Sequence, residues 1–73
     1  MKLEKILSKK FNNAKEQGLM RLVPESEAER ISNEETVFYR NGNVSFYIVE
    51  DWIYQILTLT NGYVAVKVPK EEF

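Results

Sequence analysis

Two Asn-Gly dipeptides, Asn41-Gly42 and Asn61-Gly62, constrain the fold most strongly. They interrupt a stretch from residue 36 to residue 68 that is rich in Val, Ile, Tyr, Phe and Thr. Asn-Gly suits the two central positions of a type I′ turn, because both positions require positive φ, and such a turn between strand-forming residues is typical of a β-hairpin. Residues 36–68 are therefore predicted to form antiparallel strands.

Each turn also predicts a register. Two-residue loops at the dipeptides would pair Tyr39 with Val44, Phe38 with Ser45 and Val37 with Phe46, and Leu59 with Val64, Thr58 with Ala65, Leu57 with Val66 and Ile56 with Lys67. A third turn at Glu50-Asp51 would join the hairpins and pair Val49 with Trp52, Ile48 with Ile53, Tyr47 with Tyr54 and Phe46 with Gln55. Because Glu-Asp is poor type I′ chemistry, residues 44–59 could instead be one long strand with a bulge. The meander thus has three or four strands.

This register predicts two faces of different composition, because successive strand side chains point to opposite sides of a sheet. One face is almost entirely apolar: Val37, Tyr39, Val44, Phe46, Ile48, Ile53, Leu57, Leu59, Val64, Val66 and Val68, with Gln55 as the interior exception. The other face is mixed but has an aromatic centre that contains Phe38, Tyr47, Trp52 and Tyr54. We call these the aliphatic face and the aromatic face.

Residues 2–17 form a predicted amphipathic helix. Its apolar residues fall within an arc of about 140° on a helical wheel: Leu3, Ile6, Leu7, Phe11 and Ala14. Gly18 is placed to end this helix in the left-handed conformation. The predicted fold class is α+β, with the N-terminal amphipathic helix packed on a 3–4 stranded antiparallel β-meander, in a single domain over residues 1–73.

Residues 19–35 are open to more than one interpretation. The segment 19–23 is either extended or a helical continuation, and Pro24 biases the residue before it away from helix. Ser26 and Glu29 have the spacing of a capping box. A short helix over residues 27–33 is possible, anchored by Ala28 and Ile31.

One helix can cover one face of a sheet this small, and we expect the N-terminal helix to pack on the aliphatic face. The aromatic face is then expected to be an interface, since large apolar patches on monomers usually mark interaction surfaces. The residues of this predicted interface are Phe38, Tyr47, Val49, Trp52, Tyr54 and Ile56. The expected partner is a second copy in a homodimer, which would enlarge a small core. The alternatives are an unidentified protein partner, or coverage of this face by residues 19–33.

The 73 residues include no His and no Cys, which excludes imidazole bases, thiol nucleophiles and the common zinc sites. The acidic pairs Glu34-Glu35, Glu50-Asp51 and Glu71-Glu72 lie at turns or the terminus, where charges are solvated. We therefore expect a non-enzymatic protein without catalytic residues, cofactor or metal. No run of about 18 apolar residues is present, so we expect no membrane association and a cytoplasmic location.

Charge is unevenly distributed although the net charge is −1. Residues 1–21 carry six Lys or Arg and two Glu, and residues 22–35 carry one Arg and five Glu. The lysines of the first helix, with an aromatic sheet face, suggest nucleic-acid binding as an alternative function. The acidic pI of about 5.4 argues against it.

One N-terminal helix ending at Gly18, followed by antiparallel strands around Asn41-Gly42 and Asn61-Gly62, resembles the Yopt-like family of small hypothetical proteins from bacilli, which are often prophage-encoded. The resemblance rests on size and on the order of elements. It implies one helix, three strands and a homodimer. The family has no assigned activity, so the resemblance implies no functional residue.

Overall fold

The computed structural model describes residues 2–70, which form two helices and five strands. In chain order these are α1 (Lys2–Glu16), β1 (Arg21–Val23), α2 (Glu25–Glu34), β2 (Tyr39–Asn41), β3 (Val44–Val49), β4 (Trp52–Leu59) and β5 (Gly62–Pro69). The strands form one sheet in the order β1-β5-β4-β3-β2, and every neighbouring pair is antiparallel. The predicted α+β class is confirmed. Strands β2 to β5 form the predicted meander with four strands, and β1 extends the sheet of the described residues to five, which was not predicted.

The three hairpin turns put the side chains on the predicted faces, although two of them are displaced. The turn at Glu50-Asp51 is as predicted, with Val49 opposite Trp52. The other two loops are Gly42-Asn43 and Thr60-Asn61, so Tyr39 lies opposite Phe46 and Leu59 lies opposite Gly62. Moving a loop by one residue moves each partner by two, and a two-residue shift returns every side chain to the same face.

Backbone conformation explains where the first turn lies. Gly42 has φ 62°, and Asn43 is not among the residues with positive φ. Positive φ at only the first central position fits a type II′ turn, for which Gly is the favoured first residue. The Glu50-Asp51 turn follows the same pattern, with φ 56° at Glu50. The sequence signal was therefore correct for a hairpin but wrong for the turn type.

Helix α1 ends as predicted at Gly18, which has φ 75°. The Leu19 amide donates to the Ala14 carbonyl at 2.8 Å, and the Gly18 amide donates to the Lys15 carbonyl at 3.1 Å. This pair of bonds is the Schellman motif, which satisfies carbonyls that the helix itself leaves unpaired. The chain then turns into β1, so the extended interpretation of residues 19–23 is the right one.

Helix α2 is longer than the predicted 27–33, and the capping-box prediction is wrong. Pro24 occupies the N-cap, and its carbonyl accepts a hydrogen bond from the Ala28 amide at 3.0 Å. No side chain caps this end of the helix. Ser26 lies inside the first turn, two residues past the N-cap position. Because Pro24 has the extended ψ of 148°, it separates β1 from α2 without any intervening loop.

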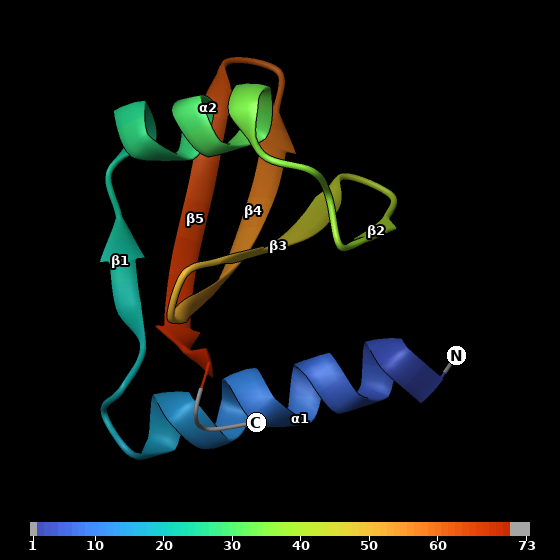
Figure 1. Ribbon diagram of the computed structural model, residues 1–73, viewed down its shortest axis with the longest axis vertical. Coiled ribbons are helices and arrows are strands. Elements are labelled where there is room, and N and C mark those ends of the chain that lie inside the picture. The colour runs from blue at the N-terminus through green and yellow to red at the C-terminus, as the bar shows by residue number, and fades with distance from the viewer. Residues whose placement is uncertain (1, 71–73) are drawn as a thin grey trace.

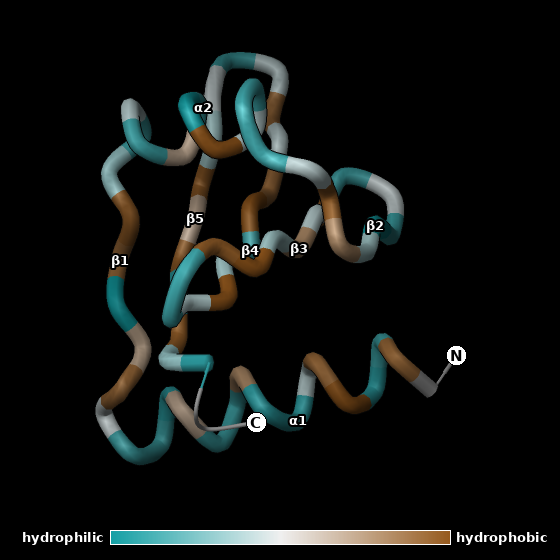
Figure 2. The backbone as a smooth tube through the Cα atoms, in the orientation of Figure 1, coloured by the Kyte–Doolittle hydropathy of each residue, from teal (hydrophilic) through white to brown (hydrophobic). Residues whose placement is uncertain are grey.

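The two helices pack on opposite faces of the sheet and lie at opposite ends of the view in Figure 1. On the aliphatic face, α1 buries a cluster formed by Leu7, Phe11, Ala14, Phe46, Ile53 and Val68. On the aromatic face, α2 and β1 bury a second cluster formed by Val23, Ala28, Ile31, Tyr47, Tyr54, Ile56 and Ala65. Figure 2 shows the strongly hydrophobic segments concentrated in the strands, with shorter ones in the helices. The sheet is therefore the middle layer of three.

Candidate functional site

The aromatic face is covered within the chain, so the expectation that it lacks an internal cover is wrong. Tyr47, Tyr54 and Ile56 are 3%, 5% and 1% exposed. Ala28 and Ile31 of α2 pack against them and are fully buried. The alternative in which residues 19–33 fold over this face is the one that the structure adopts.

The other three predicted interface residues lie at or beyond the margin of this cluster. Val49 and Trp52 are partly buried and pack against it. Phe38 lies between α2 and β2, is 49% exposed and is not part of the cluster. The structure therefore brings five of the six residues together as core and core margin, and leaves Phe38 apart.

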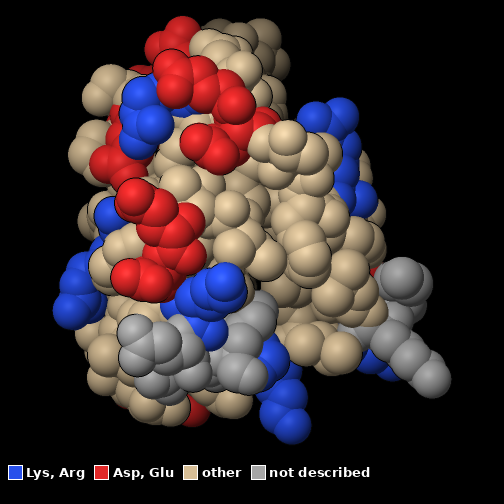
Figure 3. Space-filling view, viewed as in Figure 1, with Lys and Arg blue, Asp and Glu red and all other residues tan. Residues whose placement is uncertain are grey.

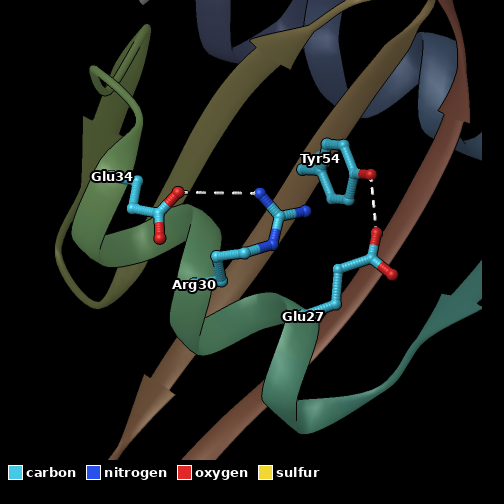
Figure 4. A network of polar contacts seen from close by, with 4 residues as sticks. All are labelled: Glu27, Arg30, Glu34 and Tyr54. Carbon is cyan, nitrogen blue, oxygen red and sulfur yellow. Dashed lines mark hydrogen bonds and ion pairs between the residues drawn. The ribbon is translucent and has the colours of Figure 1, made fainter.

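A polar contact joins α2 to the sheet at the edge of the aromatic cluster. The Tyr54 hydroxyl donates a hydrogen bond to Glu27 Oε2 at 2.7 Å, and Lys67 Nζ lies 3.6 Å from the same oxygen. Figure 4 shows the hydroxyl pointing at the carboxylate, with Arg30 on the next turn of α2 reaching toward Glu34. The Arg30–Glu34 pair is 3.8 Å apart and well exposed, so it contributes little to stability.

Lys67 also lies near two aromatic rings of the sheet, those of Trp52 and Tyr54. Its ammonium lies 4.6 Å from the centre of the Trp52 ring and 5.5 Å from that of Tyr54. Both distances are within the range of cation–π attraction, and the butyl stem can cover the rings while the charge stays near water. Lys67 therefore lies over the Trp52 ring and beside the Glu27 carboxylate, where the sheet meets α2.

The Tyr54–Glu27 bond shifts both titrations. The hydrogen bond from Tyr54, helped by the charge of Lys67, lowers the pKa of Glu27 below its ordinary value of 4.5. Burial, and then the bond to Glu27, raises the pKa of Tyr54 from 10.0 to about 12. Glu27 thus adds stability above pH 4.5 that is lost as the pH falls through its lowered pKa. Tyr54 adds stability below pH 10 that is lost as the pH rises through about 12.

Tyr54→Phe is expected to lower the free energy of unfolding by about 1.5–3 kcal/mol at pH 7, the range for hydrogen bonds to charged groups. The loss should shrink as the pH falls below 4.5, because protonated Glu27 no longer offers a charged acceptor. Urea unfolding at a series of pH values measures both effects. Tyr39→Phe is the matched control, since Tyr39 packs in the α1 cluster. An equal, pH-independent loss in both variants would contradict this account.

An uncovered apolar area remains on the aliphatic face. Leu22, Leu59 and Val64 are 85%, 47% and 54% exposed. Leu22 lies opposite Val66 and Val64 lies opposite Leu57, which places all of them on the face that α1 occupies. We call Leu22, Leu57, Leu59 and Val64 the aliphatic strip.

The path of α1 explains why the strip is exposed. Near its start, the Glu4 carboxylate accepts a hydrogen bond from the Asn41 side chain at the β2 edge. Farther along, Phe11 and Ala14 pack into the cluster that contains Val68 near the end of β5. The helix therefore crosses the face and leaves the end near the β4–β5 turn open, as the position of α1 in Figure 1 shows.

The nucleic-acid alternative needs exposed aromatic rings on the same side of the protein as the lysines, and the described residues of the aromatic face do not provide this arrangement. Lys5, Lys9 and Lys15 are exposed on α1, which packs on the aliphatic face. Tyr47 and Tyr54 are buried on the other face, under α2. A nucleic-acid strand on the lysines could not stack its bases on these rings.

Within residues 2–70, no group of three or more Asp and Glu side chains is arranged to hold a metal ion. In the same range, no helix is long and apolar enough to cross a membrane. Comparison with protein-family models, with curated proteins and with solved structures gave no match. The Yopt-like resemblance therefore stays a prediction.

Proposed function

We propose that this chain is a non-enzymatic interaction domain that forms a homodimer through the aliphatic strip. The observation that carries the proposal is that three large, exposed aliphatic side chains share one sheet face, with Leu59 and Val64 toward the β4–β5 turn and Leu22 on the edge strand β1. Contiguous exposed apolar surface on small proteins usually marks an interaction site. This surface replaces the aromatic face as the candidate interface.

A second copy is the partner that this chain's size favours. Symmetric dimers are the commonest oligomers, and a short chain without disulfides gains core by association. A stable interface buries about 800 Å² on each partner, which is about a sixth of the 5020 Å² of this chain. An interface of that size would have to extend beyond the strip onto neighbouring parts of β1, β4 and β5.

Charge distribution is compatible with a two-fold pairing. Residues 1–21 are predominantly basic and residues 22–35 predominantly acidic. Figure 3 shows acidic side chains gathered at the top of the view and at mid-height, and basic side chains in both the upper and the lower part of the view. Leu22 lies where the two charged segments meet. An antiparallel arrangement about the strip would bring the acidic segment of one copy toward the basic segment of the other, which favours that orientation.

The test is the oligomeric state of the double variant Leu22→Lys/Val64→Lys. The unsubstituted protein should sediment as a dimer at about 100 μM. The variant should sediment as a monomer, with a dimer association constant lowered at least about 100-fold. Like charges brought together across an interface cost several kcal/mol, which sets this scale. Sedimentation equilibrium measures the association, and the urea midpoint shows whether the variant remains folded.

Val37→Lys is the control, because Val37 is 37% exposed and lies outside the strip. It adds positive charge as the variants do, and it should leave the dimer intact. A monomeric original chain at about 100 μM would overturn the proposal, as would equal dissociation by Val37→Lys.

A further inference from the structure

A polar cleft of about 310 Å³ opens between the last turn of α2, the β2–β3 turn and the neighbouring strands. The residues that line it are Ser32, Arg40, Gly42, Asn43, Ser45, Thr58 and Tyr63, and none of them carries a carboxylate. Arg40 lies opposite Ser45, and Thr58 lies opposite Tyr63, so the strands bring these pairs together on one face. We call this the Arg40 cleft.

The Arg40 guanidinium is oriented by the sheet. Its Nε donates to Ser45 Oγ at 3.3 Å, and Ser45 is only 5% exposed. The two terminal nitrogens are left for another acceptor, since none of the ion pairs among residues 2–70 includes Arg40. A planar guanidinium with both terminal nitrogens available can bind two oxygens of one anion.

The other lining groups supply further donors. Ser45 Oγ accepts from Arg40, so its own proton is directed to a different acceptor. The hydroxyls of Ser32, Thr58 and Tyr63 and the amide of Asn43 can also donate. One cation surrounded by neutral donors, with no carboxylate in the lining, suits an oxyanion.

The wall of the cleft at the β2–β3 turn is held by the backbone. The Thr58 amide donates to the Asn43 carbonyl at 2.9 Å, which fixes this turn against β4. Gly42, with φ 62°, adopts at this turn a conformation that other residues rarely take. The donors on the turn and on the sheet are therefore held in place before any ligand arrives, which reduces the entropy lost on binding.

We propose that the Arg40 cleft binds a phosphoryl group, either as free phosphate or as a phosphate monoester. Its volume is at the lower limit of ligand pockets, which favours a small anion. The carbonyl end of α2 near Ser32 opposes an anion, but this effect is limited to the last turn and is screened at a surface. We therefore expect millimolar binding of free phosphate.

A second cleft beside the Arg40 cleft differs from it in charge. It also borders Tyr63, has about 380 Å³ and includes Glu25 in its lining. Glu25 Oε2 accepts a hydrogen bond from the Tyr63 amide at 3.1 Å. The negative charge and the occupied amide make this second cleft a poor anion site, so binding should be confined to the Arg40 side of Tyr63.

The proposal is tested by following the amide chemical shifts of the protein in NMR titrations. One titration uses inorganic phosphate and the other phosphoserine, both at constant ionic strength. Saturable shifts are expected at Gly42, Asn43 and Ser45, with a dissociation constant of about 1–10 mM for phosphate. Tighter binding of phosphoserine would identify a monoester as the source of the phosphoryl group. Similar binding would identify the free anion.

Arg40→Gln should weaken phosphate binding at least about 10-fold, and Arg40→Lys should weaken it less, because Lys keeps the charge but loses the fork. Arg21→Gln removes the same charge from an exposed site outside the cleft, and it should leave binding unchanged. Equal weakening by Arg21→Gln, shifts confined to the lysines of α1, or no saturable shift with either probe would overturn the proposal. The cleft and the aliphatic strip lie on opposite faces of the sheet, so failure of one proposal does not imply failure of the other.

Discussion

Ile31→Ala is expected to lower the free energy of unfolding by about 2–5 kcal/mol, the range for removing a buried Ile side chain. Ile31 is fully buried and is, with Ala28, one of the two buried residues of α2. The ten-residue helix has no side-chain cap at its start, so its stability comes from packing on the sheet. Losing Ile31 therefore removes much of what holds α2 on the aromatic face.

Urea unfolding followed by Trp fluorescence measures this loss directly, since Trp52 is the single Trp and packs against the same cluster. Ile6→Ala is the matched control, because Ile6 is 48% exposed on α1. We expect it to change the free energy of unfolding by about 0.5 kcal/mol or less. Equal effects of the two substitutions would mean that α2 does not cover the aromatic face.

Phe46→Ala is expected to lower the free energy of unfolding by about 3–5 kcal/mol, because it removes packing between α1 and the aliphatic face. Phe46 is 6% exposed and lies under α1. Its ring packs edge-on against Phe11, with centroids 5.6 Å apart and an interplanar angle of 69°, and lies 6.1 Å from Tyr39. Truncation removes the largest of the buried side chains that the sheet contributes to the α1 cluster and leaves a cavity.

Phe38→Ala is the control for this substitution, because it removes the same side chain from a site that is 49% exposed. It should cost much less than Phe46→Ala in urea unfolding. A double-mutant cycle with Phe11→Ala should then give a coupling of about 0.5–1.5 kcal/mol between the two rings. Additive losses would show that the edge-on contact itself contributes nothing beyond burial.

The strand half of the fold was predictable because its signals are local and periodic. The alternation of side chains predicted both faces, and even the displaced turns at Gly42-Asn43 and Thr60-Asn61 preserved them. Gly18 likewise predicted the end of α1, because the left-handed conformation there favours Gly.

The cover of the aromatic face was harder to predict, because α2 needs only Ala28 and Ile31 to bury itself on a narrow sheet. Two apolar positions three residues apart give a weak periodic signal. The segment just before the helix gave no periodic signal either, because Leu22 and Val23 are both apolar, although the structure exposes Leu22 and buries Val23. The candidate interface was misplaced for the same reason, since it depended on that face being open.

The place of β1 in the sheet has a consequence for folding kinetics. Arg21 pairs with Lys67 across most of the chain, whereas the three hairpins join strands that are adjacent in sequence. Bringing distant residues together costs more loop entropy than closing a hairpin, so we expect the four-stranded meander to assemble first. The segment that contains β1 and α2 would then pack on the meander last. In the native state, we expect this segment to be the first to unfold locally.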